Sequence, residues 1–181
     1  SNILVVTNRP AIANSWYEDY KKFVGVNSGY YFVSHVEALG DRQYVIDRDQ
    51  FVDLAATDEN VKGCIQFVSL QDIKGSKYFG GEPHLDKLRE LSNRLGEDGK
   101  PIGIKWDILI IDEAHEGVDT YKTDMAFDHI DRKHTLHLSG TPFKALANDK
   151  FPPEAIYNGT YADEQEAKHS WDPSQEEENP Y

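Results

Sequence analysis

The sequence predicts an α/β fold in which helices flank a mostly parallel sheet. Short runs of aliphatic, often β-branched residues recur along the chain, and such runs are typical of strands buried on both faces of a sheet. Between these runs lie stretches with apolar residues at steps of three and four, which is the pattern of an amphipathic helix. Strands that alternate with helices pair in parallel through right-handed crossovers, so the alternation indicates a parallel sheet.

The N-terminal part of the chain supplies most of the expected strands. We expect them at 3–6, 30–34, 44–46 and 65–70. A helix is expected after Pro10, a residue suited to a first helical turn, and its apolar stripe should lie on the sheet. That stripe consists of Ile12, Trp16, Tyr20 and Phe23. A second helix, before the last of these strands, is indicated by Phe51, Leu54 and Ala55.

The C-terminal part continues the alternation and then loses it. A helix is marked by Leu85, Leu88, Leu91 and Leu95, and a turn-rich connection is expected over 96–103. The run 108–111 predicts a buried strand, and 135–138 predicts a further short strand. Tyr121, Met125 and Ile130 indicate a helix between them. Beyond residue 150 the pattern weakens, and 170–181 has the composition of a solvated tail.

Composition narrows the class of protein. The chain has 181 residues and a formal net charge of -13, and seven acidic residues and one lysine lie within 163–181. Such an acidic chain is a poor nucleic-acid binder by itself, because affinity for phosphates depends mainly on Lys and Arg. Its single cysteine, Cys64, lies in an apolar run and is expected to be an inert buried thiol. No membrane span or signal peptide is visible, so we expect a cytoplasmic protein.

Polar clusters follow four of the expected strands at the point where each strand ends. They are Thr7-Asn8-Arg9, Ser69 to Gln71, Asp112-Glu113 and Ser139 to Thr141. The carboxyl ends of parallel strands meet at one edge of a sheet, where open α/β folds bind ligands. Adjacent carboxylates at such an edge can hold a hydrated Mg²⁺ and orient a water molecule. The sequence therefore predicts a ligand site at this edge.

Other residues have simpler interpretations. His129, His134 and His137 show no local spacing of metal ligands, so we do not expect a metal site there. The aromatic run 30–32 is expected in the core or on a sheet face rather than as a platform for stacked bases.

Two motifs in order carry a family resemblance. The segment Asp112-Glu-Ala-His115 after an apolar strand, followed by Ser139-Gly-Thr-Pro142, resembles motifs II and III of superfamily 2 helicases and translocases. Thr7-Asn-Arg-Pro10 looks like motif Ia. The segments 67–72 and 139–144 are similar to those of the branch that includes the helicase subunit of type III restriction enzymes. The resemblance covers roughly residues 3 to 147.

The resemblance implies a RecA-like P-loop NTPase domain that uses ATP and Mg²⁺. Asp112 would hold Mg²⁺ through a water molecule, and Glu113 would activate the water that attacks ATP. His115, Ser139 and Thr141 would couple the nucleotide state to the nucleic-acid face. The residues that resemble contacts to a nucleic-acid strand are Thr7, Asn8, Arg9, Ser69 and Gln71.

The chain also departs from the family pattern. The phosphate-binding motif Gly-x-x-x-x-Gly-Lys-Ser/Thr does not occur in it. The sequence begins without Met, close to a strand, so we expect a partial helicase domain 1 over 3–160, truncated at its N-terminal side and followed by an acidic linker over 161–181. The phosphate loop would precede residue 1, and a second motor domain would follow residue 181. The chain alone is expected to be inactive.

The resemblance implies that the parent protein is an ATP-driven motor that moves on duplex DNA in a restriction–modification system. Its partners would be nuclease and methyltransferase or specificity modules. Two alternatives stay open from the sequence. The first is an RNA helicase motor, since RNA helicases share the Asp-Glu-Ala-His motif. The second is a non-catalytic module that binds nucleic acid or protein.

Overall fold

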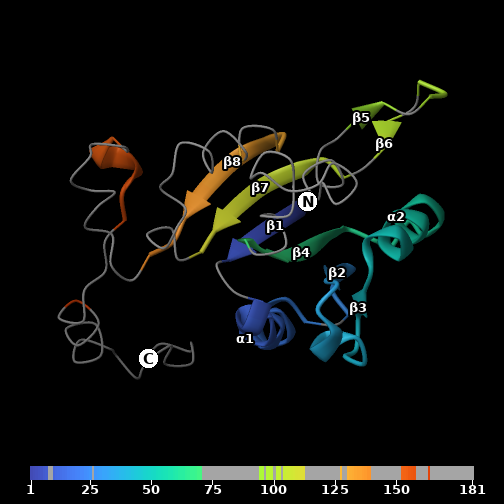
Figure 1. Cartoon of the computed structure of the whole chain (residues 1–181), viewed down its shortest axis with the longest axis horizontal. Coiled ribbons are helices and arrows are strands. Elements are labelled where there is room, and N and C mark those ends of the chain that lie inside the picture. The colour runs from blue at the N-terminus through green and yellow to red at the C-terminus, as the bar shows by residue number, and fades with distance from the viewer. Residues whose placement is uncertain are drawn as a thin grey trace, which may run out of the picture. The chain divides into compact units, whose positions relative to one another are not determined.

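The computed structural model forms two compact units, Ser1–Pro142 and Phe143–Tyr181, each considered by itself (Figure 1). It describes residues 1–7, 10–25, 27–70, 97–99, 104–112, 127, 130–139, 152–157 and 163, and the backbone of 94–95 and 101–102. In the second unit, the described helix is one 3-10 turn, η6 (Pro153–Ala155). No helix among the described residues is long and apolar enough to cross a membrane.

The first unit is built on a parallel sheet, which confirms the predicted fold class. The sheet has six strands in the order β3-β2-β4-β1-β7-β8, and every neighbouring pair is parallel. The bounds are β1 (Asn2–Thr7), β2 (Tyr30–Val33), β3 (Val45–Ile46), β4 (Gly63–Ser69), β7 (Trp106–Ile111) and β8 (Arg132–His137). Figure 1 shows β4, β1, β7 and β8 side by side.

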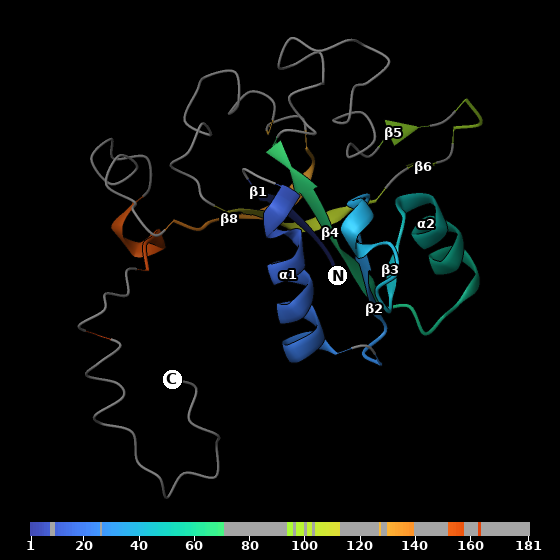
Figure 2. The same ribbon diagram turned by 60° about the horizontal axis from the view of Figure 1, so that its bottom comes forward.

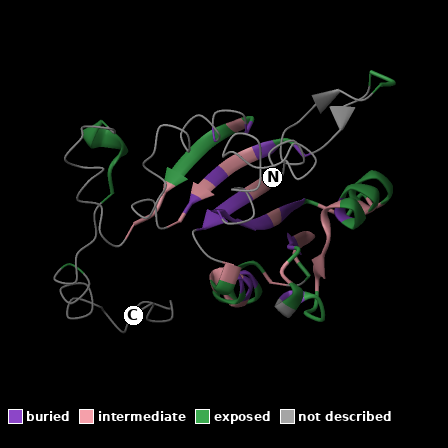
Figure 3. Ribbon diagram, in the orientation of Figure 1, coloured by how far each residue is buried: buried purple, intermediate pink, exposed green. Residues whose placement is uncertain are grey.

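Strand β1 lies in the interior of this sheet because both of its faces are apolar. Leu4, Val5 and Val6 are at most 1% exposed, as expected for a strand covered on both sides. Strand β8, at one edge, is different: its four central residues are exposed, and Figure 3 shows it as a mostly green strand next to β7. The carboxyl end of β1 is therefore enclosed in the buried interior of the sheet.

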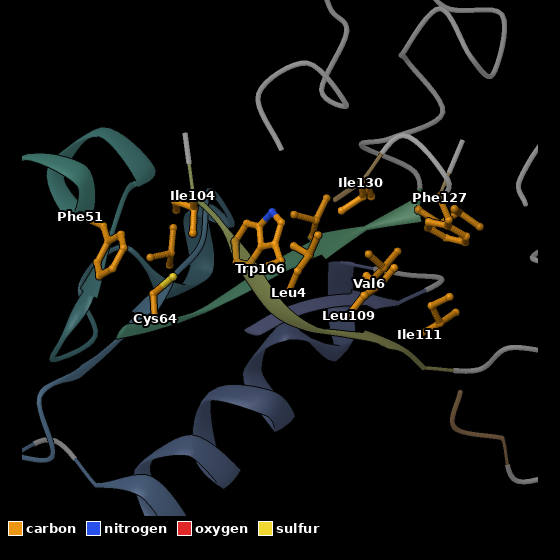
Figure 4. Close-up of a cluster of buried hydrophobic side chains, with 13 residues drawn as sticks. Leu4, Val6, Phe51, Cys64, Ile104, Trp106, Leu109, Ile111, Phe127 and Ile130 are labelled. Carbon is orange, nitrogen blue, oxygen red and sulfur yellow. The ribbon is translucent and has the colours of Figure 1, made fainter. Parts of the chain in front are cut away.

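Two hydrophobic clusters cover the two faces, since successive strand residues point to opposite sides. Leu4 and Val6 belong to one cluster, together with Phe51 from α2 (Arg48–Thr57) and side chains of β4 and β7 (Figure 4). Val5 belongs to the other, together with Ala13 and Tyr17 of α1 (Ala13–Asp19). The two helices thus pack on opposite faces, and Figure 2 shows them well separated.

The helical segment after β1 has a different buried face from the predicted one. It consists of η1 (Pro10–Ile12), α1 and a π-helical turn, η2 (Tyr20–Val24). The fully buried residues are Ala13, Tyr17 and Tyr20, whereas Phe23, expected on the sheet, is 72% exposed. The prediction for Phe23 was wrong because a π-helical turn is wider than an α-helical one and redirects the residues that follow.

Two further expectations need correction. Leu95 was expected in a helix, but it lies in β5 (Arg94–Leu95), which pairs antiparallel with β6 (Pro101–Ile102). A turn that includes Gly99, at a φ of +75°, separates these two strands. Leu95 therefore pairs across this chain reversal and does not continue the helix that the leucine spacing predicted. Ile130 is buried but lies outside any described helix. The rest of both predicted helices falls outside the described residues, apart from the helical Phe127.

Candidate nucleotide and metal site at the carboxyl edge of the sheet

Four of the predicted site residues lie at the same edge of the sheet. Thr7 ends β1 and pairs with Ser69, which ends β4. Asp112 directly follows β7, and its amide donates to the carbonyl of Val6 at 2.9 Å. Asp112, Thr7 and Ser69 therefore lie side by side in one row across the sheet. On the other side, the Leu138 amide donates to the carbonyl of Ile111 at 2.8 Å. Ser139 is therefore one residue beyond that row.

These four residues differ in how far they are buried. Thr7 and Ser69 are at most 1% exposed, so their hydroxyls lie beneath the edge rather than on its surface. Asp112 and Ser139 are half-buried and can be reached from solvent. The edge consequently has a closed half, at β1 and β4, and an accessible half, at β7 and β8.

The Asp112 carboxylate has a defined partner on helix α1. The indole Nε1 of Trp16 donates a hydrogen bond to Oδ2 of Asp112 at 3.2 Å. Both residues are half-buried. The alternation of side chains along a strand explains the contact. Asp112 is two residues after Ile110, so both point to the face of the sheet that α1 covers.

The remaining predicted site residues fall outside the described part of the chain. These are Asn8, Arg9, Gln71, Glu113, His115 and Thr141. Each is next to, or within three residues of, one of the four residues located above. The segments that carry these six residues are thus adjacent in sequence to residues at the described edge.

Comparison with known protein families decides the chain's relationship. The family model described as type III restriction enzyme, res subunit, matches residues 1–144, which is most of the chain. The chain belongs to this family. The predicted resemblance to the helicase subunit of type III restriction enzymes is thereby confirmed. A search of curated proteins found no match.

Membership of the type III restriction enzyme res subunit family fixes the general chemistry. The domain is helicase-like and of the P-loop NTPase type, and it serves the ATP-dependent motor of these enzymes. ATP and Mg²⁺ are the general requirements of such a motor. The parallel sheet agrees with this family, because P-loop NTPases bind nucleotide at the carboxyl edge of such sheets.

The side chains described at this edge of the res-family domain suit Mg²⁺ held mainly by water. A carboxylate such as that of Asp112 is the hard oxygen ligand that Mg²⁺ prefers. Within the described residues there is no group of three or more His, Cys, Asp and Glu side chains that could enclose a metal. Mg²⁺ commonly keeps several waters and binds one or two carboxylates plus substrate phosphates. These 181 residues contain no Gly-Lys-Ser/Thr loop that could bind the phosphates of the nucleotide.

A second aspartate on the same strand has a structural environment. The Asp107 carboxylate accepts from the Asn2 amide at 2.8 Å and pairs with the Lys133 ammonium at 2.8 Å. The Lys133 hydrogen bond, and after it that of Asn2, lowers the pKa of Asp107 from its usual value. Asp107 thus joins β1, β7 and β8 at their amino ends, opposite the candidate site.

Sequence reasoning missed three residues at the carboxyl edge. Ser34 and His35 follow β2, and Ser34 is only 7% exposed; the rule that found the other polar clusters would also have found these. Trp16 was assigned only to the apolar stripe of its helix. Its contact with Asp112 joins positions 96 residues apart, so nothing in the local sequence could indicate it.

Proposed function

We propose that this chain supplies the Mg²⁺-binding and water-activating half of an ATP-driven motor that moves on duplex DNA in a restriction–modification enzyme. One observation carries the proposal: Thr7, Ser69, Asp112 and Ser139, from four motif-like segments, end at one edge of a parallel sheet. The family match supports the same assignment.

Within this proposal Asp112 and Glu113 have separate roles. Asp112 holds Mg²⁺ through a bound water molecule, because a single half-buried carboxylate suits outer-sphere binding of this strongly hydrated ion. Glu113, the next residue, orients the attacking water and accepts its proton. Bound Mg²⁺ would neutralise charge that develops on the transferred phosphoryl group.

The neighbouring strands carry the proposed link to nucleic acid. Ser139, with Thr141 and His115, exchanges hydrogen bonds as the nucleotide state changes, since hydroxyl and imidazole groups can both donate and accept. Asn8, Arg9 and Gln71 contact the backbone of one strand, and such contacts position a strand without reading its sequence. The buried Thr7 and Ser69 anchor the segments that carry them.

We further propose that the chain is one part of a larger machine. The helicase domain would span 3–160, and the acidic residues 161–181 would link it to a second motor domain. Without a phosphate-binding loop the chain cannot cradle ATP, so turnover requires a parent enzyme that supplies this loop. Nuclease and methyltransferase modules would be its partners there.

The test is nucleic-acid-stimulated ATP turnover by the parent enzyme. Duplex DNA should stimulate hydrolysis, and Glu113→Gln should lower kcat by about a thousandfold or more while ATP still binds. The control is Glu18→Gln, which alters an exposed acid on α1 that pairs with Lys21. Stimulation by RNA alone would favour an RNA helicase, and full activity of Glu113→Gln would reject the assignment of the water-activating residue.

A further inference from the structure

We infer that Trp16 is a positioning residue for Asp112, which it holds in the orientation that the metal site needs. The inference deepens the proposed function and rests on it, because it takes Asp112 as the residue that binds Mg²⁺. Its basis is the hydrogen bond of 3.2 Å from the Trp16 indole to the Asp112 carboxylate.

The helix that carries Trp16 is firmly attached to the sheet. Tyr17 donates from its hydroxyl to the Gln43 carbonyl at 3.2 Å, and the Tyr20 hydroxyl donates to the Tyr30 carbonyl at 2.6 Å. Ala13, Tyr17 and Tyr20 are each at most 3% exposed. Trp16 lies beside this buried face and packs partly against the same cluster. Its N–H is therefore presented from a fixed position, which is what preorganises an interaction.

The chemistry of the pair suits a site for a cation. An indole N–H is only a donor, and an ionised carboxylate is only an acceptor, so the contact selects one orientation of the charged form of Asp112. A neutral donor fixes a carboxylate without cancelling its negative charge. At the other end of the same strand, Lys133 supplies an opposite charge to Asp107. Residues that orient a metal-binding carboxylate commonly change metal affinity by about ten- to a hundredfold.

The α1 helix offers a matched control. Trp16 and its neighbour Tyr17 each donate one hydrogen bond of 3.2 Å from an aromatic side chain, but only Trp16 donates to Asp112. Trp16→Phe and Tyr17→Phe each remove one such donor and retain an aromatic ring. A difference between these variants at Asp112 therefore reports on the specific contact rather than on the loss of any bond from this helix.

The experiment is a titration of the 181-residue chain with Mg²⁺ alone, followed by NMR at the backbone amides of Ile111 and Asp112. This local readout separates the site from weak binding of Mg²⁺ elsewhere on an acidic chain. We expect the local Kd to rise about tenfold in Trp16→Phe and to stay unchanged in Tyr17→Phe. Trp16→His, which retains a ring N–H, should recover part of the affinity.

The outcomes separate this inference from the proposed function. A Trp16→Phe chain that binds Mg²⁺ at Asp112 as tightly as the unchanged chain overturns the role of Trp16 and leaves that of Asp112 intact. Absence of any Mg²⁺ response at Asp112, or the same response in Asp112→Asn, overturns the metal role and the inference with it.

A second measurement does not depend on a variant of Trp16. Asp112→Asn replaces the charged acceptor by a weaker one, so the indole proton signal of Trp16 should move upfield. Asp107→Asn should leave that signal in place. If the chemical shift of the Trp16 indole proton is the same in Asp112→Asn as in the unchanged chain, the hydrogen bond does not form in solution and the inference fails.

Discussion

Two aspartates, one within β7 and one directly after it, show how environment separates a structural carboxylate from one proposed to be functional. Asp107 is the second residue of β7 and binds a lysine and a backbone amide, whereas Asp112 follows the last residue of β7 and accepts from an indole. The contacts of Asp107 link β1, β7 and β8. Asp112 is half-buried at the edge where parallel sheets bind ligands. The residue type alone would not distinguish them.

The Asp107 ion pair should affect stability in a pH-dependent way. We expect Asp107→Asn to lower the free energy of unfolding by about 0.5 to 1 kcal/mol at neutral pH, a small value because the pair is open to solvent. Since the pKa of Asp107 is lowered from 3.8 in the folded chain, its stabilisation is complete above that value and is lost as the pH falls through the folded pKa.

Urea unfolding of the unchanged chain and of Asp107→Asn at about pH 7 and about pH 3 checks this expectation. The difference between the two proteins should shrink at the lower pH. A difference that is as large in acid as at neutral pH would contradict it.

The single thiol should be almost unreactive while the chain is folded. Cys64 is 0% exposed, and burial raises the pKa of its thiol to about 12. The thiolate is the reactive form, so its population near pH 8 is lower by about three orders of magnitude than for an exposed cysteine. Labelling with a thiol reagent should be slow in buffer and rapid in urea. Complete labelling of the folded chain within minutes would show that β4 opens readily.

At the scale of residues, sequence locates groups whose position follows from a strand end. Asp112 and Ser139 were predictable because each comes directly after an apolar run. Trp16 was not predictable as a partner of Asp112, since its side chain suits an apolar stripe equally well. Only the packing of α1 on the sheet shows that the Trp16 side chain also donates a hydrogen bond to Asp112.

Among the helices, α2 depends most clearly on its first turn. The Asp47 side chain accepts from the Gln50 amide at 2.8 Å, and the Gln50 side chain accepts from the Asp47 amide at 3.0 Å. This reciprocal capping box satisfies two amides that the helix leaves unpaired. Since α2 buries Phe51 in the core, its first turn also fixes one side of the hydrophobic cluster.

Asp47→Ala should lower the free energy of unfolding by about 1 kcal/mol, the usual value for loss of such a cap. The matched control is Asp49→Ala, which removes an acid of the same first turn that does not cap the helix. Asp49→Ala should cost only a few tenths of a kcal/mol, from the helix dipole. Chemical denaturation of both variants measures this, and equal losses would contradict a specific contribution of the cap.

At the scale of elements, strands were easier to predict than helix faces. All six strands of the main sheet were expected from short runs rich in apolar residues. The signal is clearest for β1 and β4, because burial on both faces leaves a nearly continuous apolar run, whereas the central residues of β8 are exposed. Strand β3 was shorter than expected: Tyr44 has a φ of +62° and lies before β3, so the strand begins at Val45. The face of α1 and the β5–β6 pair depend on a π-helical turn and on strand pairing, which spacing does not reveal.

For the whole molecule, the order of the strands unites the candidate site. Strands β4, β1, β7 and β8 are neighbours, so segments more than 130 residues apart in sequence, from Thr7 to Ser139, end side by side. Alternation in the sequence predicted one common edge, but not this order. The hydroxyls of Thr7 and Ser69 also proved to be buried, which spacing could not foretell.

The isolated chain should not turn over ATP. Its sequence contains no loop for the phosphates, and positioning of the phosphates supplies much of the catalysis in phosphoryl transfer. Phosphate release in the presence of ATP, Mg²⁺ and duplex DNA should stay at the level of a protein-free control. ATP turnover by the isolated chain that is lost in Glu113→Gln would contradict the proposal that the site needs a phosphate-binding loop from elsewhere in the parent enzyme.

The most direct test of the site compares two aspartates in the parent enzyme: Asp107, within β7, and Asp112, which directly follows it. DNA-stimulated ATP turnover is measured against Mg²⁺ concentration for the parent, Asp112→Asn and Asp107→Asn. If the carboxyl edge holds the metal, Asp112→Asn loses turnover by about a hundredfold or more at low Mg²⁺. Asp107→Asn, changed at the opposite end of the same strand, keeps the Mg²⁺ dependence of the parent. Equal effects of the two substitutions, or none from Asp112→Asn, would contradict the placement of the motor's metal site at this edge.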